Sequence, residues 1–485
     1  MSSGRDLQVI LSNLKGLFLT IGIIMLFMAL ICVLTGDTKI SDGFFYGAII
    51  GIAFWVILKI IFPATFDLEL RHAMIVAALA YLIVPAISMI PFVTIQHMAP
   101  IDAFFESISG WTTSGFSMIP DPASSNYMIL LWRSVTQWIG GLGVILLMVT
   151  ILIRPGTGAF ILYQSEARKD KIHPSIRSTL NSIWSLYLIL TIAGILLLMA
   201  AGMPAWDSLN QSMAAISSGG FSIYADSIGT YNSIWIELAV IPIMIAGALP
   251  FVVLYKAFRK DIRQLFNDIQ VRTFILLTAI GAVLLTLENY HFYGSLLTSA
   301  RYSVFQYISA ATTTGFQTAD VSTWSKSALL IMSIAMIIGG CAGSSAGGIK
   351  VARAYFLSND VKLWFAKTLM SKNTIVTVKL GNKRVTEDAV NNELAEATLI
   401  SFLWIISILV SVLLLSHVVS TSFDLSHIIF AVCSAQGNVG ITCGIINPDM
   451  SYIGKIIIII DMWVGRLEII PVLMLVRYMF KGFSR

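Results

Sequence analysis

Long apolar runs are the feature that most constrains the fold of this chain. They occur at 16–34, 44–62, 179–201, 273–287, 399–416 and 456–476. A helix needs about 20 apolar residues to cross the hydrocarbon of a bilayer, and a soluble domain carries about 25% charged residues. Here only 12% of the 485 residues are charged and 57% are hydrophobic. We therefore predict an all-α polytopic membrane protein embedded in a lipid bilayer.

The charged residues indicate how the chain is oriented. Lys and Arg concentrate near both termini and in the segments 154–177, 256–272 and 350–384. By the positive-inside rule these segments and both termini are cytoplasmic, and their charge needs no nucleic acid as a partner. The intervening loops contain most of the acids, which either attract cations to an entrance or form a solvated surface. These acids are Asp102, Glu106, Asp121, Asp207, Asp226, Asp320, Asp424 and Asp449.

Four polar strips, each ending in glycine, recur along the apolar chain. Each follows a short segment that cannot span a bilayer and precedes a polar loop and a second apolar run. The second runs contain similar triplets, 139–141, 245–247, 338–340 and 464–466, which end 26, 27, 25 and 26 residues after the strip glycine. Strips 1 to 4 are Thr112, Thr113, Ser114 and Gly115; Ser217, Ser218, Gly219 and Gly220; Thr312, Thr313, Thr314 and Gly315; and Gly437, Asn438, Val439 and Gly440.

This spacing predicts a fourfold repeat. Each unit reads as helix, short re-entrant pore helix, strip and helix, and four units surround a central pore with pseudo-fourfold symmetry. The predicted parts are an N-terminal transmembrane helix pair at 1–67 and repeats at 68–165, 166–262, 263–380 and 381–485. Non-helical backbone at membrane depth is tolerated where it is buried in protein or lines a water-filled path. The alternative is four surface hairpins that never enter the membrane.

The composition of the strips suggests what they bind. Glycine allows the backbone angles that turn successive carbonyls inward. Rings of such oxygens can replace the water shell of a dehydrated monovalent cation, and the C-terminal ends of the short helices favour positive charge there. A phosphate site would instead need amide hydrogens and usually a GKS or GKT tripeptide, which the sequence lacks.

The four strips, TTSGFS, SSGGFS, TTTGFQ and GNVGIT, each behind a short helix, resemble the filters of the Trk/Ktr/HKT superfamily of cation transporters. The extra helix pair at 1–67 makes the chain similar to the membrane subunits of bacterial Trk potassium uptake systems. The resemblance implies K+ as the transported ion with no organic cofactor, a homodimer in the bacterial inner membrane, and a cytosolic TrkA-type nucleotide-binding regulatory subunit. The intact strip glycines imply a preference for potassium over sodium, and proton coupling is left open.

The segment GGCAGSSAGGIK (339–350) interrupts the second apolar run of the third repeat. Its density of glycine and serine cannot maintain a straight helix, because each interior glycine costs about 1 kcal/mol relative to alanine. It resembles the family's intramembrane gating loop; the alternative is a small-residue surface for helix packing. The candidate gate residues in this loop are Gly339, Gly340, Gly343, Gly347, Gly348 and Lys350.

Arg466 stands where the other repeats have Gly141, Gly247 and Gly340. An arginine in a membrane helix rarely faces lipid. We expect it to face the pore and to form a constriction with the 339–350 loop. The alternative is a structural salt bridge to an acid on another helix.

Two other classes of function remain in competition. A secondary transporter of another small cation, such as a sodium symporter, also uses broken helices at the membrane midplane, although such folds show inverted repeats. An intramembrane serine protease could use GSSAGG, but it would need a histidine base within a span, and no histidine is placed for that. We therefore expect a transporter and not an enzyme.

Overall fold

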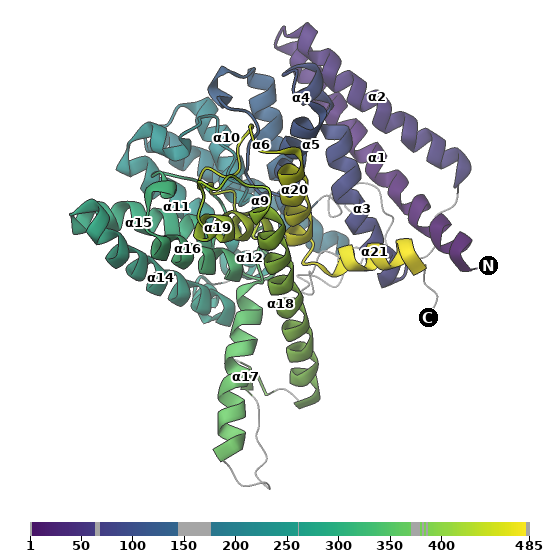
Figure 1. Cartoon of the computed structure of the whole chain (residues 1–485). Coiled ribbons are helices and arrows are strands. Elements are labelled where there is room, and N and C mark those ends of the chain that lie inside the picture. Colours follow the sequence, from purple (N-terminus) through teal and green to yellow (C-terminus); the bar gives the residue numbers. More distant parts are fainter. Residues whose placement is uncertain are drawn as a thin grey trace.

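Helices account for nearly all regular structure in the computed structural model (Figure 1), which describes residues 2–63, 68–143, 176–259, 261–369, 379–380, 383–384 and 387–481. The exception in these ranges is a small antiparallel pair, β1 (Lys379–Leu380) and β2 (Lys383–Arg384). The repeat boundary predicted at 165/166 lies outside the described residues, as does most of the basic segment 154–177. The predicted repeat limits remain predictions.

Six helices in the described ranges are long and apolar enough to cross a membrane, or seven if one sharply bent pair is counted as a single span. This agrees with the polytopic architecture predicted from the apolar runs. The spanning helices are α1 (Ser2–Leu34), α2 (Thr38–Ile61), α3 (Leu70–Ser88) continuing into α4 (Ile90–Thr94), α9 (Ile176–Ala200), α14 (Ile269–Tyr293) and α18 (Glu387–Ser416).

A short helix follows one spanning helix in each of the four units. With 12 to 16 residues at about 1.5 Å per residue, these helices fall short of the ~30 Å hydrocarbon layer. Each ends at its polar strip, as predicted. The short helices are α5 (Pro100–Trp111), α10 (Ala205–Ile216), α15 (Leu296–Ala311) and α19 (Leu425–Gln436). The loops beyond the strips contain the 3-10 turns η1 (Pro122–Ser124), η2 (Ser227–Tyr231) and η3 (Val321–Thr323).

The second helices are shorter than a full membrane span. They are α6 (Tyr127–Leu142), α11 (Ile234–Ala248), α16 (Lys326–Ile338) and α20 (Tyr452–Arg466). Three of them are followed, after a break, by α12 (Phe251–Arg259), α17 (Val351–Leu369) and α21 (Ile470–Lys481). The short α13 (Arg263–Asn267) comes before α14.

The breaks correct one prediction from the sequence. The apolar run 456–476 is not a single helix, because α20 ends at Arg466, and Glu468 and Ile469 adopt positive φ angles of 54° and 68°. In the second unit α11 and α12 meet at 109° across Leu249 and Pro250, where proline cannot continue the helix. Hydropathy alone does not register such breaks, because the residues on both sides stay apolar.

The N-terminal helix pair packs onto the first unit. Side chains of α1 and α2 share a hydrophobic cluster with α3, α6 and α21. At the start of α1 the Asp6 carboxylate lies 3.1 Å from His72 Nε2 on α3, and both side chains are buried. Gly22 and Gly51 allow α1 and α2 to approach closely: a Cβ on Gly51 would lie 3.0 Å from the carbonyl oxygen of Phe18.

This close approach predicts that Gly51→Leu separates α1 from α2. Overpacking of this kind costs about 1–3 kcal/mol, so we expect a clear fall in the thermal unfolding midpoint of the detergent-solubilised protein. Ala53→Leu is the matched control, because Ala53 is an exposed residue on the same helix. Equal midpoints for the two variants would contradict this packing.

Candidate functional site

The four short helices end in the same backbone motif. Each cap residue is followed by a residue in the left-handed region, at φ of 57°, 54°, 53° and 52° for Thr113, Ser218, Thr313 and Asn438. The next residue donates its N–H back into the last helical turn, which makes the paired closure known as a Schellman motif. These bonds run from Ser114, Gly219, Thr314 and Val439 to the carbonyls of Ser109, Ala214, Ser309 and Ser434, each at 2.9 Å.

The strips themselves form a closed ring. At every strip glycine an added Cβ would overlap the carbonyl oxygen of the residue before the glycine in the next strip. The pairs are Gly115 with Gly219, Gly220 with Thr314, Gly315 with Val439, and Gly440 with Ser114. The order 1, 2, 3, 4 and back to 1 requires the four strips to surround one axis. Surface hairpins, the alternative left open by the sequence, would not produce this cycle.

The four backbones agree although the side chains differ. All strip glycines have positive φ, between 74° and 92°, so strip 4 matches strip 1 despite Asn438 and Val439 in place of Thr113 and Ser114. One asymmetry lies in strip 2. Gln137 on α6 donates from Nε2 to the carbonyl of Gly219 at 2.6 Å and accepts from the N–H of Phe221 at 3.0 Å.

The 339–350 segment lies against the strips at their helix-proximal ends. Gly347 donates its N–H to Thr313 Oγ1 at 2.8 Å and approaches the carbonyl of Gly437 so closely that no Cβ would fit. Ser345 Oγ lies 2.8 Å from Ser218 Oγ. One loop therefore contacts strips 2, 3 and 4.

The loop is built from residues with unusual backbone angles. Positive φ occurs at Gly339, Gly343, Gly348 and Lys350. Gly339 packs against Gly347 and Gly348, and Gly340 packs against Ala346 and Ala248, so the loop folds back on itself. Lys350 Nζ donates to the carbonyl of Ala346 within the loop.

Arg466 connects this loop to strip 1. Its Nη1 donates to Thr113 Oγ1 at 3.1 Å and to the carbonyl of Ser345 at 2.8 Å. Its Nη2 donates to the carbonyls of Gly140 and Gly141, which end the second helix of the first unit. Arg466 therefore lies next to the loop. Together, Arg466 and the loop contact all four strips, each at its residue in the left-handed region or at the residue beside it.

The alternative of a salt bridge to Arg466 has no support within the described residues, where no carboxylate pairs with it. The nearest acid in sequence, Glu468, pairs with Arg353 on α17 instead. Arg353 also donates to the carbonyl of Ile349, so this ion pair joins the end of the loop to the break between α20 and α21.

Two of the acids predicted to lie in outer loops are instead buried side chains on short helices. Glu106 and Asp207 lie on the short helices α5 and α10 and are 0% and 5% exposed. Neither description proposed for them, a cation-attracting surface or a solvated one, applies. Asp207 accepts from the hydroxyl of Tyr231 at 2.7 Å, and Asp102 pairs with Lys455 at 2.6 Å.

Sequence reasoning also missed residues that hold the ring. Gln137 carries no periodicity or spacing signal, because its role depends on a strip 82 residues away. Arg133 could have been noticed as a second arginine inside an apolar helix, by the argument that singled out Arg466.

Comparison with known proteins identifies the family of this chain. Residues 42–482 match the TrkH family, described as cation transport proteins. The chain belongs to the TrkH family. An uncharacterised cation transporter of Methanocaldococcus jannaschii is 33% identical over 97% of this chain and 95% of its own length. The Trk system potassium uptake protein TrkG of Escherichia coli is 31% identical over 92% of this chain and 85% of its own.

A solved structure extends the comparison to the fold. The crystal structure of the potassium transporter TrkH from Vibrio parahaemolyticus superposes with a TM-score of 0.82 at 26% identity, covering 98% of this chain and 99% of the other. The TrkH-family chain described here is therefore a multi-pass membrane protein and a cation transporter, not an enzyme.

The ring predicts a sharp difference between two glycines. Gly220 and Gly294 both have positive φ, 74° and 65°, so alanine is strained at either by roughly 1–2 kcal/mol. Only Gly220 also faces a neighbouring carbonyl, whereas nothing lies within 4 Å of a Cβ at Gly294. We expect Gly220→Ala to lose most cation flux in proteoliposomes and Gly294→Ala to retain it. Similar flux in the two variants would contradict a role for the ring in transport.

Proposed function

We propose that this transporter takes up potassium through the pore enclosed by strips 1 to 4. The observation that carries the proposal is the closed ring of strips, in which the backbone repeats four times around one axis. Equivalent carbonyls at successive levels can replace the water shell of a K+ ion. The same contact from each strip to the next, repeated in one direction around the ring, relates the four units by rotation about one axis, which also argues against the inverted twofold repeat of a broken-helix sodium symporter.

The gate in this proposal is the 339–350 loop together with Arg466. The loop contacts strips 2, 3 and 4 and Arg466 contacts strip 1, so together they occupy the helix-proximal side of the ring. A fixed positive charge at that level opposes the passage of a cation. The loop has small side chains, and its movement would need the Arg466 bond to Ser345 to break.

The proposed setting is the bacterial inner membrane, with both termini cytoplasmic. The start of α1 and the end of α21 lie on the same side of the bundle (Figure 1), as the positive-inside rule requires for this charge distribution. The proposed assembly is a homodimer, and the repeats are proposed to run over 68–165, 166–262, 263–380 and 381–485.

A cytosolic TrkA-type nucleotide-binding subunit is the proposed regulator. The Escherichia coli and Vibrio parahaemolyticus relatives are named as Trk-system and TrkH proteins, which supports a subunit of that kind here. Helices α17 and α18 extend together from the rest of the bundle (Figure 1). Exposed apolar side chains on α17 provide a surface for such a partner: Val361, Trp364, Phe365 and Leu369. Because α17 starts at the end of the gating loop, a force on it reaches the gate directly.

Ion flux into proteoliposomes tests the proposed function. We expect potassium and rubidium to enter much faster than sodium, because the oxygens of the ring replace the hydration of the larger ions. Sodium entering as fast as potassium would contradict the potassium proposal. A channel-like path should pass the ion when a membrane potential is imposed without a pH gradient. A proton-coupled path should also respond to a pH gradient imposed without a membrane potential.

Removing the charge at Arg466 tests the gate. We expect Arg466→Ala to increase potassium flux several-fold at equal amounts of reconstituted protein, because the barrier to cations falls and the loop loses its tie to strip 1. Arg466→Lys keeps the charge but cannot reproduce all the guanidinium hydrogen bonds, so its potassium flux should lie between that of the wild type and that of Arg466→Ala. Unchanged flux in Arg466→Ala, with a lower unfolding midpoint, would assign Arg466 a structural role instead.

A further inference from the structure

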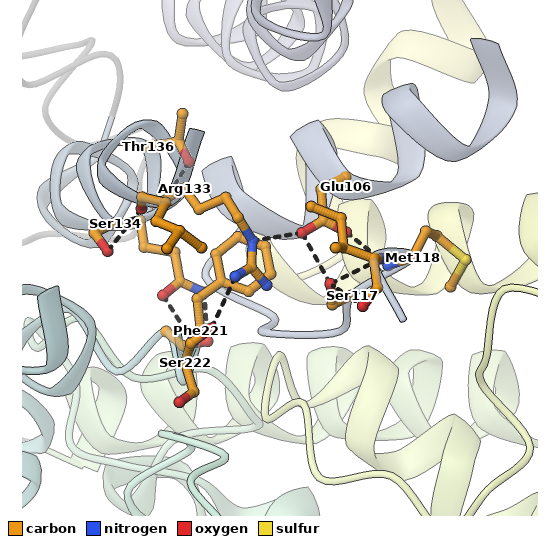
Figure 2. Close-up of polar contacts among 12 residues, drawn as sticks. Glu106, Ser117, Met118, Arg133, Ser134, Thr136, Phe221 and Ser222 are labelled. Atoms are coloured by element: carbon orange, nitrogen blue, oxygen red, sulfur yellow. Dashed lines mark hydrogen bonds and ion pairs between the residues drawn. The ribbon is translucent and has the colours of Figure 1, made fainter. Parts of the chain in front are cut away.

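A buried ion pair lies behind strips 1 and 2 (Figure 2). Glu106 on α5 and Arg133 on α6 are 0% and 2% exposed, and Arg133 Nε lies 2.7 Å from Glu106 Oε1. Figure 2 shows that the pair does not stand alone, because each partner also binds backbone next to a strip. None of these contacts belongs to the gate described above.

Each partner of the pair holds a different strip. Glu106 accepts from the N–H of Met118 at 2.6 Å and from Ser117 Oγ at 3.1 Å, just beyond strip 1. Arg133 Nη1 donates to the carbonyl of Ser222 at 2.8 Å, just beyond strip 2, and its guanidinium lies 4.2 Å from the centre of the Phe221 ring. The ion pair therefore links the outer ends of two neighbouring strips.

The carbonyl of Ser222, which accepts from Arg133, has equivalents in two other units. Ser222, Gln317 and Thr442 each lie two residues beyond a strip glycine. The carbonyl of Gln317 accepts from the N–H of Gly229 at 3.0 Å, and that of Thr442 accepts from Gln317 Nε2 at 3.3 Å. Each of the three carbonyls is thus held by a donor from the preceding unit. The donor to Ser222 is the charged one.

The repeat shows that the fold does not require this charge. The position of Glu106, nine residues before the strip glycine, is Gln211, Gln306 and Ala431 in the other units. The position of Arg133, eight residues before the end of the triplet, is Ala239, Met332 and Ile458. A buried ion pair is weak evidence for a contribution to stability, since neutral residues often replace one without loss. Its presence in one unit alone calls for another explanation.

We propose that Glu106 and Arg133 are positioning residues for cation selection. They fix the contact between strips 1 and 2, called the seam below, so that the ring keeps the width set by its backbone. A charge-assisted hydrogen bond is roughly twice as strong as a neutral one and holds its partners more tightly. A looser seam lets the carbonyls of these two strips move inward and coordinate a smaller ion. The inference rests on the proposed role of the strips in selecting the transported ion.

The decisive variant combines Glu106→Gln with Arg133→Met. It gives the first unit the two residues that the third unit has at the equivalent positions, Gln306 and Met332. The control is Glu237→Gln combined with Arg301→Met, which neutralises another ion pair, at 2.6 Å, that joins α11 to α15 without contacting a strip. Selectivity is measured in proteoliposomes as the flux ratio between the cation that the wild type passes best and the next best.

We expect the ratio to fall at least tenfold in the first double variant and to stay within about twofold of wild type in the control, with both proteins folded by thermal unfolding. An unchanged ratio in a folded Glu106→Gln, Arg133→Met protein would overturn the inference. If that protein does not fold, Arg133→Lys decides. Lysine keeps the charge but cannot bind both Glu106 and the carbonyl of Ser222 as the guanidinium does, so the ratio should still fall, and an unchanged ratio overturns the inference. A wild type that prefers sodium would overturn the potassium proposal while leaving this test of the seam intact.

Discussion

The close approach of each strip glycine to the carbonyl of the next strip is the constraint on which the rest of the structure depends. It leaves no space for a side chain at Gly115, Gly220, Gly315 or Gly440, and it occurs at backbone angles that only glycine adopts without strain. The short helices and their Schellman closures deliver the backbone to these positions, and the surrounding helices bury it. A ring of main-chain oxygens is thereby held by packing that is independent of the side chains in the strips.

The four units share this backbone, but what lies around the ring differs from unit to unit. A single chain can place a loop in one second helix, an arginine at the end of another and an ion pair behind strips 1 and 2, which a ring of four identical subunits cannot do. The 339–350 loop contacts three strips because it is not repeated three more times around the axis. Asymmetry in the supporting residues is therefore compatible with symmetry in the proposed ion path.

The sequence predicted what depends on spacing and periodicity, and missed what depends on distant contacts. The apolar runs, the short helices and the strips follow from local composition, and the nearly constant distance of 25 to 27 residues from each strip glycine to the end of the later triplet located Arg466. The contact between Gln137 and strip 2, and the burial of Glu106 beside Arg133, join residues far apart in the sequence and have no local signature. The break after Arg466 was missed because Leu467 and Ile469 continue the apolar pattern while the backbone leaves the helix.

The position of the break after Arg466 also bears on how the proposed gate can move. Ile469 is a β-branched residue at φ of 68°, a conformation that costs free energy and persists only where neighbouring contacts enforce it. The adjacent Glu468 is held by Arg353 in the first turn of α17, the helix that follows the 339–350 loop. The strained break and the loop are thus connected by one ion pair on the same side of the ring. A displacement of α17 that separates Arg353 from Glu468 would release the end of the loop from this break. Because Arg466 also binds the carbonyl of Ser345, movement of the loop is expected to require both contacts to break.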